Sequence, residues 1–211
     1  MVDGQEQKNC EEFFGSSNFN FDMIKYFTLE GNDYWIRDHG PIFVYDKDKK
    51  LCVVDFEWNQ YGYKSFLTDY FHGDLHLVNE KLSDLNIRQK GQVDSLFAAK
   101  FNLPIVKSWL VTEGGAMESN GRGTLILNKN LMIQRNPDSS LVSMERELRR
   151  VVGAKNIIWL DYGLAEDVHI VGTITQNFIG MGTGGHTDEF VRFADPKTIL
   201  LASVTLEDSQ S

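Results

Sequence analysis

The sequence has few cysteines, no excess of positive charge and no long apolar run. Its 211 residues include only Cys10 and Cys52 as cysteines. Two thiols favour neither a disulfide framework nor a zinc ribbon, and free thiols fit a reducing compartment. Each apolar run is shorter than the roughly 18 residues that a membrane helix needs, and the first residues do not resemble a signal peptide. We therefore expect a cytoplasmic protein without a membrane partner.

The charge balance is negative, with a net charge of −9 at pH 7. Proteins that bind nucleic acids gather Lys and Arg against the phosphates, so we expect no nucleic-acid partner. An acidic chain suits a cationic ligand, although many proteins without one are equally acidic. Hydrophobic residues make up 42% and charged residues 24%, an ordinary globular composition. We expect one domain over residues 1–211.

Short apolar strands and one helix alternate in the N-terminal half. Residues 42–45 and 51–58 are joined by a charged linker and predict a hairpin. Apolar residues at helical spacing predict a helix over 92–102. Pro104 ends that helix, and residues 105–112 predict a strand. Residues 71–77, which include two histidines, are typical of a loop.

The C-terminal half favours a similar mixture. Residues 124–127 and 131–134 predict a second hairpin. The apolar residues Met144, Leu148, Val151 and Val152 would share one helix face, with Ser140 or Ser143 at its N-cap and Gly153 at its C-cap. Further strands are expected at 157–160, 168–171, 190–193 and 198–204. This order predicts an α+β or mixed α/β fold.

Three segments place reactive side chains beside glycine or proline: residues 35–41, 112–115 and 182–189. Each adjoins an apolar run, so each is expected at a strand end, where functional sites are commonly built. Taken singly, each segment also has a purely structural explanation. It could be a turn, a solvated carboxylate or a set of side chains that bond the backbone.

Two other chemistries compete for the third segment. Residues 180–185 match G-x-G-x-x-G, but a dinucleotide fold needs a helix directly afterwards, and residues 186–193 alternate instead. His186 and Asp188, together with Asp38 and His39, could ligate a metal in a hydrolase. The sequence has no Cys pairs and no H-E-x-x-H helix to support that reading. We expect no metal and no cofactor.

Four motifs together resemble the guanidino-group-modifying enzymes called penteins. The resemblance is to the branch that contains agmatine deiminases and bacterial peptidylarginine deiminases. The motifs occur in the family's order and read Trp35-Ile36-Arg37-Asp38-His39-Gly40-Pro41, Glu113-Gly114-Gly115, Gln134-Arg135-Asn136-Pro137 and Gly185-His186-Thr187-Asp188. The resemblance implies a propeller-like ring of five ββαβ modules, of which this chain would hold about three to four.

The resemblance also implies substrate contacts. A guanidinium is planar and presents its N–H donors in a fork, which carboxylates match with charge-assisted hydrogen bonds. Asp38 and Asp188 would be those carboxylates, and Trp35 and Arg37 would also belong to the substrate-binding set. The substrate would be a small cationic guanidine.

Catalysis in the family uses a cysteine thiolate that attacks the guanidinium carbon. By resemblance, His186 would protonate the leaving ammonia and then activate water. Glu113 would hold His186 and favour its charged form. The expected reaction is hydrolytic deimination. It would convert agmatine to N-carbamoylputrescine, a step toward putrescine, or peptidyl-arginine to peptidyl-citrulline.

The chain departs from the family pattern in two places. The family's cysteine lies well beyond Gly-His-x-Asp, and neither Cys10 nor Cys52 has that position, so we expect the 211-residue chain to be inactive alone. Agmatine deiminases usually have Asp-Thr-Asp before Gly-His. Here the segment is Gly182-Thr183-Gly184, so two carboxylates are expected to be missing near the site. A non-catalytic relative that binds guanidines or a protein partner is the alternative hypothesis.

Overall fold

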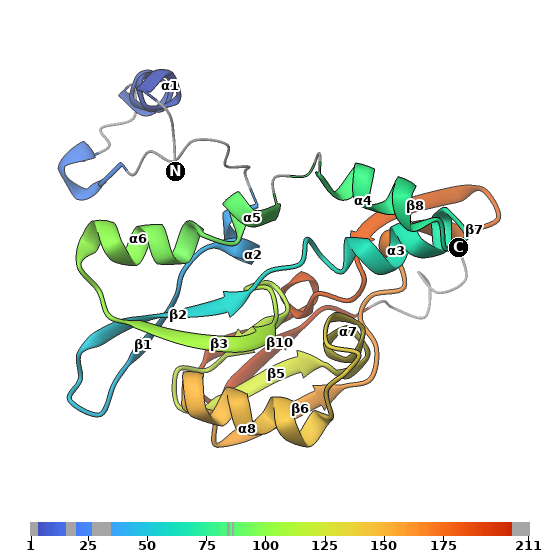
Figure 1. Cartoon of the computed structure of the whole chain (residues 1–211). Helices are drawn as coiled ribbons and strands as arrows, with labels where there is room; N and C mark the ends of the chain where they lie inside the picture. Colours follow the sequence, from blue (N-terminus) through green and yellow to red (C-terminus); the bar gives the residue numbers. More distant parts are fainter. Residues whose placement is uncertain (1–3, 16–19, 27–34, 84, 86, 204–211) are drawn as a thin grey trace.

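Two three-stranded sheets of the same topology form the body of the molecule (Figure 1). The computed structural model describes residues 4–15, 20–26, 35–83, 85 and 87–203. In each sheet the first two strands are antiparallel, and the third strand runs parallel to the second. A helix connects the second strand to the third in both cases. The described part of the chain therefore contains two complete ββαβ units.

The first unit confirms the predicted hairpin, helix and strand. Its strands are β1 (Ile42–Tyr45), β2 (Leu51–Glu57) and β3 (Ile105–Val111), and its connecting helix is α6 (Val93–Phe101). The chain between β2 and α6 also forms α3 (Tyr63–Tyr70), α4 (Leu75–Ser83) and α5 (Ile87–Lys90). The loop predicted for residues 71–77 therefore ends where α4 begins, because Asp74 accepts hydrogen bonds from the first backbone N–H groups of that helix.

The second unit corrects the predicted hairpin over residues 124–134. Its strands are β4 (Met117–Ser119), β5 (Thr124–Asn128) and β6 (Asn156–Leu160), and its helices are α7 (Lys129–Arg135) and α8 (Leu141–Val152). The partner of β5 is β4, which precedes it. Residues 131–134 are helical, because the Asn128 side chain caps α7 by accepting from the N–H groups of Asn130 and Leu131. An asparagine interpreted as a turn residue is therefore a helix N-cap.

Helix α8 has the predicted caps and the predicted buried face. Ser140 is its N-cap and accepts from the Ser143 N–H, and Gly153 ends it with φ of +68°. Met144, Leu148 and Val151 are buried in the main core, and Val152 packs against that core. The core contains residues from β2, β3, β5, α7 and α8, so it joins the two units.

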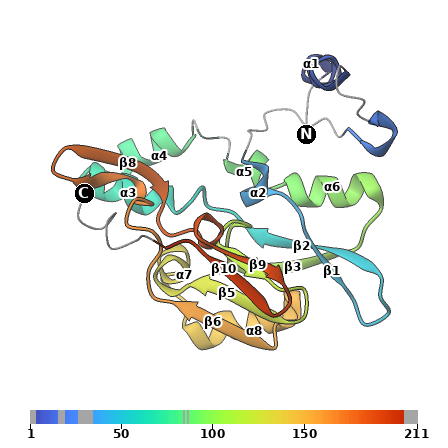
Figure 2. The ribbon, with the colours of Figure 1, turned by 180° about the vertical axis from the view of Figure 1, so that it is seen from behind.

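Two further hairpins complete the chain. Strands β7 (His169–Thr175) and β8 (Phe178–Thr183) project beside α3 and α4, as Figure 2 shows from behind. Strands β9 (Val191–Asp195) and β10 (Thr198–Leu201) follow a short 3-10 helix, η2 (Thr187–Glu189). The prediction missed β8, because residues 180–185 were considered only for their match to G-x-G-x-x-G and for their place beside His186. The strand predicted over 198–204 ends at Leu201, and Val204 lies outside the described residues.

The N-terminal elements precede the first unit. They are α1 (Gly4–Gly15), the 3-10 helix η1 (Phe21–Met23) and α2 (Ile36–His39). Figure 1 shows α1 set apart from the sheets, whereas α2 lies against the first unit. Over the part of the chain that the structure describes, no helix combines the length and apolarity needed to cross a bilayer.

Truncation of Leu148 tests the placement of α8. Leu148 is 0% exposed in the core, so Leu148→Ala should lower the free energy of unfolding by about 2–5 kcal/mol. Val142 lies on the same helix and is 68% exposed, so Val142→Ala should stay within about 0.5 kcal/mol of the parent. Urea unfolding followed by circular dichroism measures both, and equal small losses would contradict the buried face.

Candidate active site

All three polar segments lie at strand ends, as predicted. Helix α2 leads into β1 through Gly40 and Pro41, Glu113 follows β3, and His186 follows β8 directly before η2. The structure brings Asp38, Glu113, His186 and Asp188 together into one cluster. The three segments lie far apart in the sequence, so the cluster depends on tertiary folding.

Gly115 joins the three segments through its backbone. Its N–H donates to Asp38 Oδ1 at 3.1 Å, and its carbonyl oxygen accepts from the N–H groups of Thr187 and Asp188, each at 3.1 Å. A side chain at this position would not fit, because a Cβ would lie 2.4 Å from His186 Nδ1 and 2.6 Å from Asp38 Oδ1. The second glycine of Glu-Gly-Gly therefore lets the histidine and the aspartate approach each other.

The His186 ring lies between carboxylates on both sides. Its Nε2 is 3.4 Å from Glu113 Oε2. Its Nδ1 is 3.6 Å from Asp38 Oδ1 and 4.0 Å from Asp188 Oδ1. His186, Glu113 and Asp38 are buried, whereas Asp188 is partly exposed. A charged imidazole is the natural occupant of such a position, since the protonated ring donates from both nitrogens.

The surroundings raise the pKa values of three groups in and beside the cluster. Burial alone lowers the pKa of His186, but contact with Glu113 and the negative charges of Glu113, Asp38 and Asp188 outweigh it, so the pKa is raised. Burial raises the pKa of Asp38, and its hydrogen bonds only partly offset this. Burial and nearby carboxylates raise the pKa of Glu189 to about 7. That Glu113 favours the charged form of His186 stays a prediction.

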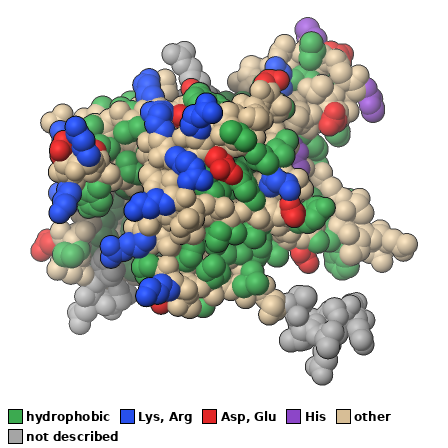
Figure 3. Space-filling view, turned by 90° about the horizontal axis from the view of Figure 1, so that it is seen from below, with side chains coloured by type: hydrophobic (Ala, Val, Ile, Leu, Met, Phe, Trp, Pro, Cys, Tyr) green, Lys and Arg blue, Asp and Glu red, His purple; other side chains and the backbone are tan. Residues whose placement is uncertain are grey.

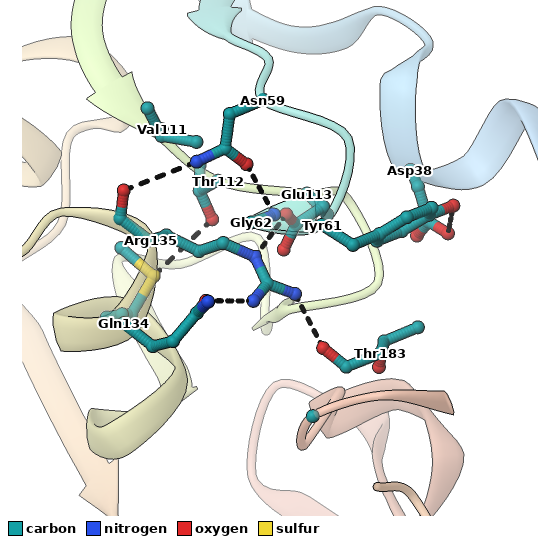
Figure 4. A network of polar contacts seen from close by, with 12 residues as sticks. Asp38, Asn59, Tyr61, Gly62, Val111, Thr112, Glu113, Gln134, Arg135 and Thr183 are labelled. Carbon is teal, nitrogen blue, oxygen red and sulfur yellow. Dashed lines mark hydrogen bonds and ion pairs between the residues drawn. The ribbon is translucent and has the colours of Figure 1, made fainter. Parts of the chain in front are cut away.

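Arg135 balances the charge of Glu113 from the side opposite His186. Glu113 is 0% exposed, and Arg135 Nε lies 2.7 Å from its Oε1 (Figure 4). The Arg135 guanidinium also donates to the Thr183 carbonyl oxygen at 2.6 Å and to the Gln134 side chain. Burial raises the pKa of Glu113, but Arg135 and His186 outweigh it and keep the pKa low. The structure therefore excludes the interpretation of Glu113 as a solvated turn residue.

Arg37 contacts one of the predicted guanidinium-binding carboxylates. Its Nε is 3.3 Å from Asp188 Oδ2, and its Nη2 is 3.6 Å from Glu118 Oε2. The Arg37 guanidinium thus already occupies part of Asp188. Trp35 lies at the N-cap of α2 with 55% exposure. Substrate contact by Arg37 and Trp35 stays a prediction.

Tyr61 belongs to the cluster and was not identified from the sequence. Its hydroxyl donates to Asp38 Oδ2 at 2.8 Å, and its ring centroid is 5.9 Å from that of His186. Gln60 and Tyr61 both have φ of 56°, a region that non-glycine residues rarely adopt. Such local strain is commonly found at functional sites. The only sequence signal was the position of Tyr61 in the loop that follows β2.

Asp167 was also missed, and it lies beside the segment in which two carboxylates are expected to be missing. It is buried beside the Gly182-Thr183-Gly184 segment and accepts hydrogen bonds from the backbone of residues 183–186. At least one carboxylate is therefore supplied to this segment from an earlier part of the chain. The β7–β8 hairpin brings Asp167 next to residues 183–186. Sequence spacing alone does not indicate this contact.

The cysteines lie elsewhere. Cys10 is on α1, and Cys52 is a buried thiol near the hairpin end of β2, whereas the opposite end of β2 leads to Tyr61. Among the residues placed by the structure, no group of three or more His, Cys, Asp or Glu side chains has an arrangement suited to a metal. A cavity of about 10 Å³ beside Asp38, His39 and Asp94 has room for little more than a water molecule.

Comparison with solved structures gives the class of protein. An Enterococcus faecalis agmatine deiminase structure matches with a TM-score of 0.68 and 23% identity, over 99% of this chain and 48% of that chain. A C. jejuni agmatine deiminase variant with substrate bound matches with a TM-score of 0.60 and 25% identity, over 92% of this chain and 47% of that chain. The molecule is a mixed α/β protein with the pentein propeller fold, which confirms the predicted fold class.

Sequence comparison gives the family. A Streptomyces coelicolor protein, provisionally named agmatine deiminase, is 32% identical over 176 residues, or 82% of this chain and 44% of the relative. The agmatine deiminase of Pseudomonas aeruginosa is 29% identical over 188 residues, or 85% and 42%. The profile of the Porphyromonas-type peptidyl-arginine deiminases matches residues 1–211. The chain belongs to that family, and it spans less than half the length of these curated relatives.

The protonation of His186 can be tested by NMR titration of its ring. Its pKa should lie above the ordinary 6.5. Its stabilising effect should be complete below about pH 6.5 and lost as the pH rises through the higher folded value. Glu113→Gln should lower the pKa of His186, but it also removes the ion-pair partner of Arg135. Asp38→Asn should lower the same pKa and leaves the Glu113–Arg135 pair intact. Glu80→Gln on the exposed face of α4 is the control. A His186 pKa unchanged in both site variants would contradict the assignment.

Proposed function

We propose that the protein deiminates a guanidinium substrate hydrolytically. One observation carries the proposal: the buried His186 ring lies within 4.0 Å of Asp38 and Asp188 through Nδ1 and contacts Glu113 through Nε2. This arrangement offers two carboxylates for a planar cation and a proton donor at the same place. Family membership and the names of the relatives support the same chemistry.

The carboxylates would bind the substrate and set its orientation. Asp38 and Asp188 would accept the N–H groups of the guanidinium, with Arg37 giving up its contact to Asp188 when the substrate enters. Asp38 is held by Tyr61 and by the Gly115 N–H, so its position is fixed before binding. Such preorganisation reduces the entropy that must be lost in the reactive complex.

His186 would transfer protons in both halves of the reaction. A thiolate adds to the guanidinium carbon, and the tetrahedral intermediate expels ammonia after one nitrogen takes a proton from His186. Neutral His186 then removes a proton from water, which attacks the same carbon and releases the thiolate and a ureido product. We expect the thiolate to come from polypeptide outside these 211 residues, because Cys10 and Cys52 lie elsewhere.

Agmatine is the first substrate to consider and peptidyl-arginine the second. Relatives named agmatine deiminase support the former, and the family description supports the latter. We further propose a cytoplasmic location, consistent with two free thiols.

Nucleic acid is not proposed as a partner, although Figure 3 shows Lys and Arg side chains gathered on one face. Some of this positive charge is balanced locally. On α8, Arg149 lies 3.4 Å from Glu145 and Arg150 lies 2.7 Å from Glu147. Together with the net charge of −9, this local pairing gives no reason to propose a nucleic-acid partner.

Turnover by the complete gene product tests the proposal. It should convert agmatine, or an arginine-containing peptide, to a ureido product and ammonia, measured by a colorimetric ureido assay. His186→Asn should lower kcat by about 10²–10⁴-fold, because proton transfer is lost. Asp38→Asn and Asp188→Asn should mainly raise KM. Glu80→Gln should behave as the parent, and full activity in His186→Asn would refute the proposed role.

Calorimetry separates the non-catalytic alternative from the enzyme. A guanidine-binding relative would give heat with agmatine, would lose it in Asp38→Ala and Asp188→Ala, and would yield no ureido product. Putrescine, which lacks the guanidinium, is the matched control ligand. Binding of putrescine equal to that of agmatine would show that the carboxylates do not recognise the guanidinium.

A further inference from the structure

The side chain of Asp167 accepts five hydrogen bonds from one loop. Neither the resemblance nor the proposed chemistry assigns it a role. Its Oδ2 accepts from the His186 N–H at 2.8 Å, the Gly185 N–H at 2.5 Å and the Thr183 hydroxyl at 2.8 Å. Its Oδ1 accepts from the N–H groups of Thr183 and Gly184. One carboxylate therefore bonds four consecutive backbone N–H groups and one hydroxyl, and it does so while buried.

The β7–β8 hairpin brings this carboxylate to the loop. Its register pairs His169 with Thr183, so the residues just before β7 lie opposite those just after β8. Gly182 leaves the space that the carboxylate occupies, since a Cβ there would lie 2.1 Å from Asp167 Oδ1. The hairpin and the glycine together are what permit the contact across a separation of 16 to 19 residues.

Only an ionised carboxylate suits this set of partners. All five groups are donors, and an aspartate without its proton only accepts. An amide would present its NH₂ to backbone N–H groups and leave some of them unpaired. Burial raises the pKa of Asp167, but hydrogen bonds from the Thr183 hydroxyl and the backbone outweigh it, so the pKa is lowered.

The loop that carries His186 is consequently fixed on both sides. On one side Asp167 bonds residues 183–186, where Gly184 and Gly185 have φ of +88° and +118°. On the other side, the Gly115 carbonyl oxygen accepts from Thr187 and Asp188. A loop with two successive left-handed glycines has many alternative conformations. The Asp167 carboxylate stabilises the loop conformation in which the His186 ring contacts Glu113 and Asp38.

We propose that Asp167 is the positioning residue of His186. It acts through the backbone of the Thr183–His186 segment and does not touch the ring. Its importance for catalysis rests on the proposed function, whereas its effect on the loop does not.

Hydrogen exchange in Asp167→Asn tests the proposal on the chain as it stands. The N–H groups of residues 183–186 should exchange at least about tenfold faster than in the parent, because charge-assisted bonds are lost. The pKa of the His186 ring should fall as the ring loses its fixed place. Amides of α8 should keep their protection. Glu166→Gln, a neutralised neighbour with an exposed side chain, is the matched control and should change none of these quantities.

Unchanged exchange at Gly185 and His186 in Asp167→Asn, or an equal effect of Glu166→Gln, would overturn the proposal. If the variant does not fold, acid titration of the parent decides the matter. The Asp167 carboxyl carbon should titrate below its ordinary pKa of 3.8, and the amide shifts of Gly185 and His186 should move with the same midpoint. Amides that do not follow that titration would equally overturn it. Failure of agmatine binding would affect the proposed function and leave these results intact.

Discussion

Burial of a histidine among carboxylates is the constraint on which the site depends. His186 and Glu113 are withdrawn from water, and a buried charge is costly unless it is paired. The chain meets this requirement by placing Glu113 between the His186 imidazole and the Arg135 guanidinium. Each group stabilises the ionised form of its neighbour, so the positions and the protonation states are set together.

The pairing requirement also explains why backbone contacts are so dense around the site. Asp38, Gly115 and the residues after His186 are joined by direct hydrogen bonds, and Asp167 holds the residues before it. A shift in the loop would separate opposite charges in a medium of low polarity, where their interaction is strong. The fold therefore resists such a shift, and the polar cluster has a defined geometry before any ligand arrives.

The comparison of prediction with structure separates local from non-local information. The helix α8 was predicted with its buried face and caps because its signals lie within the short segment 140–153. The segment 124–134 was misread because Asn128 serves equally well in a turn and at an N-cap, and only the pairing of β5 with β4 decides between them. Strand β8 was missed because its glycines suit a turn when its antiparallel partner is unknown.

The sequence by itself determined the family, since four motifs in the family's order, which contain Asp38, Glu113, Arg135 and His186, carried the resemblance to the guanidino-group-modifying enzymes. The tertiary structure alone decided which groups support them. Tyr61, Arg135 and Asp167 reach the cluster from a strained loop, from the end of α7 and from the base of the β7–β8 hairpin. Their approach depends on strand register and backbone dihedral angles, and these follow from long-range packing that no local residue pattern contains.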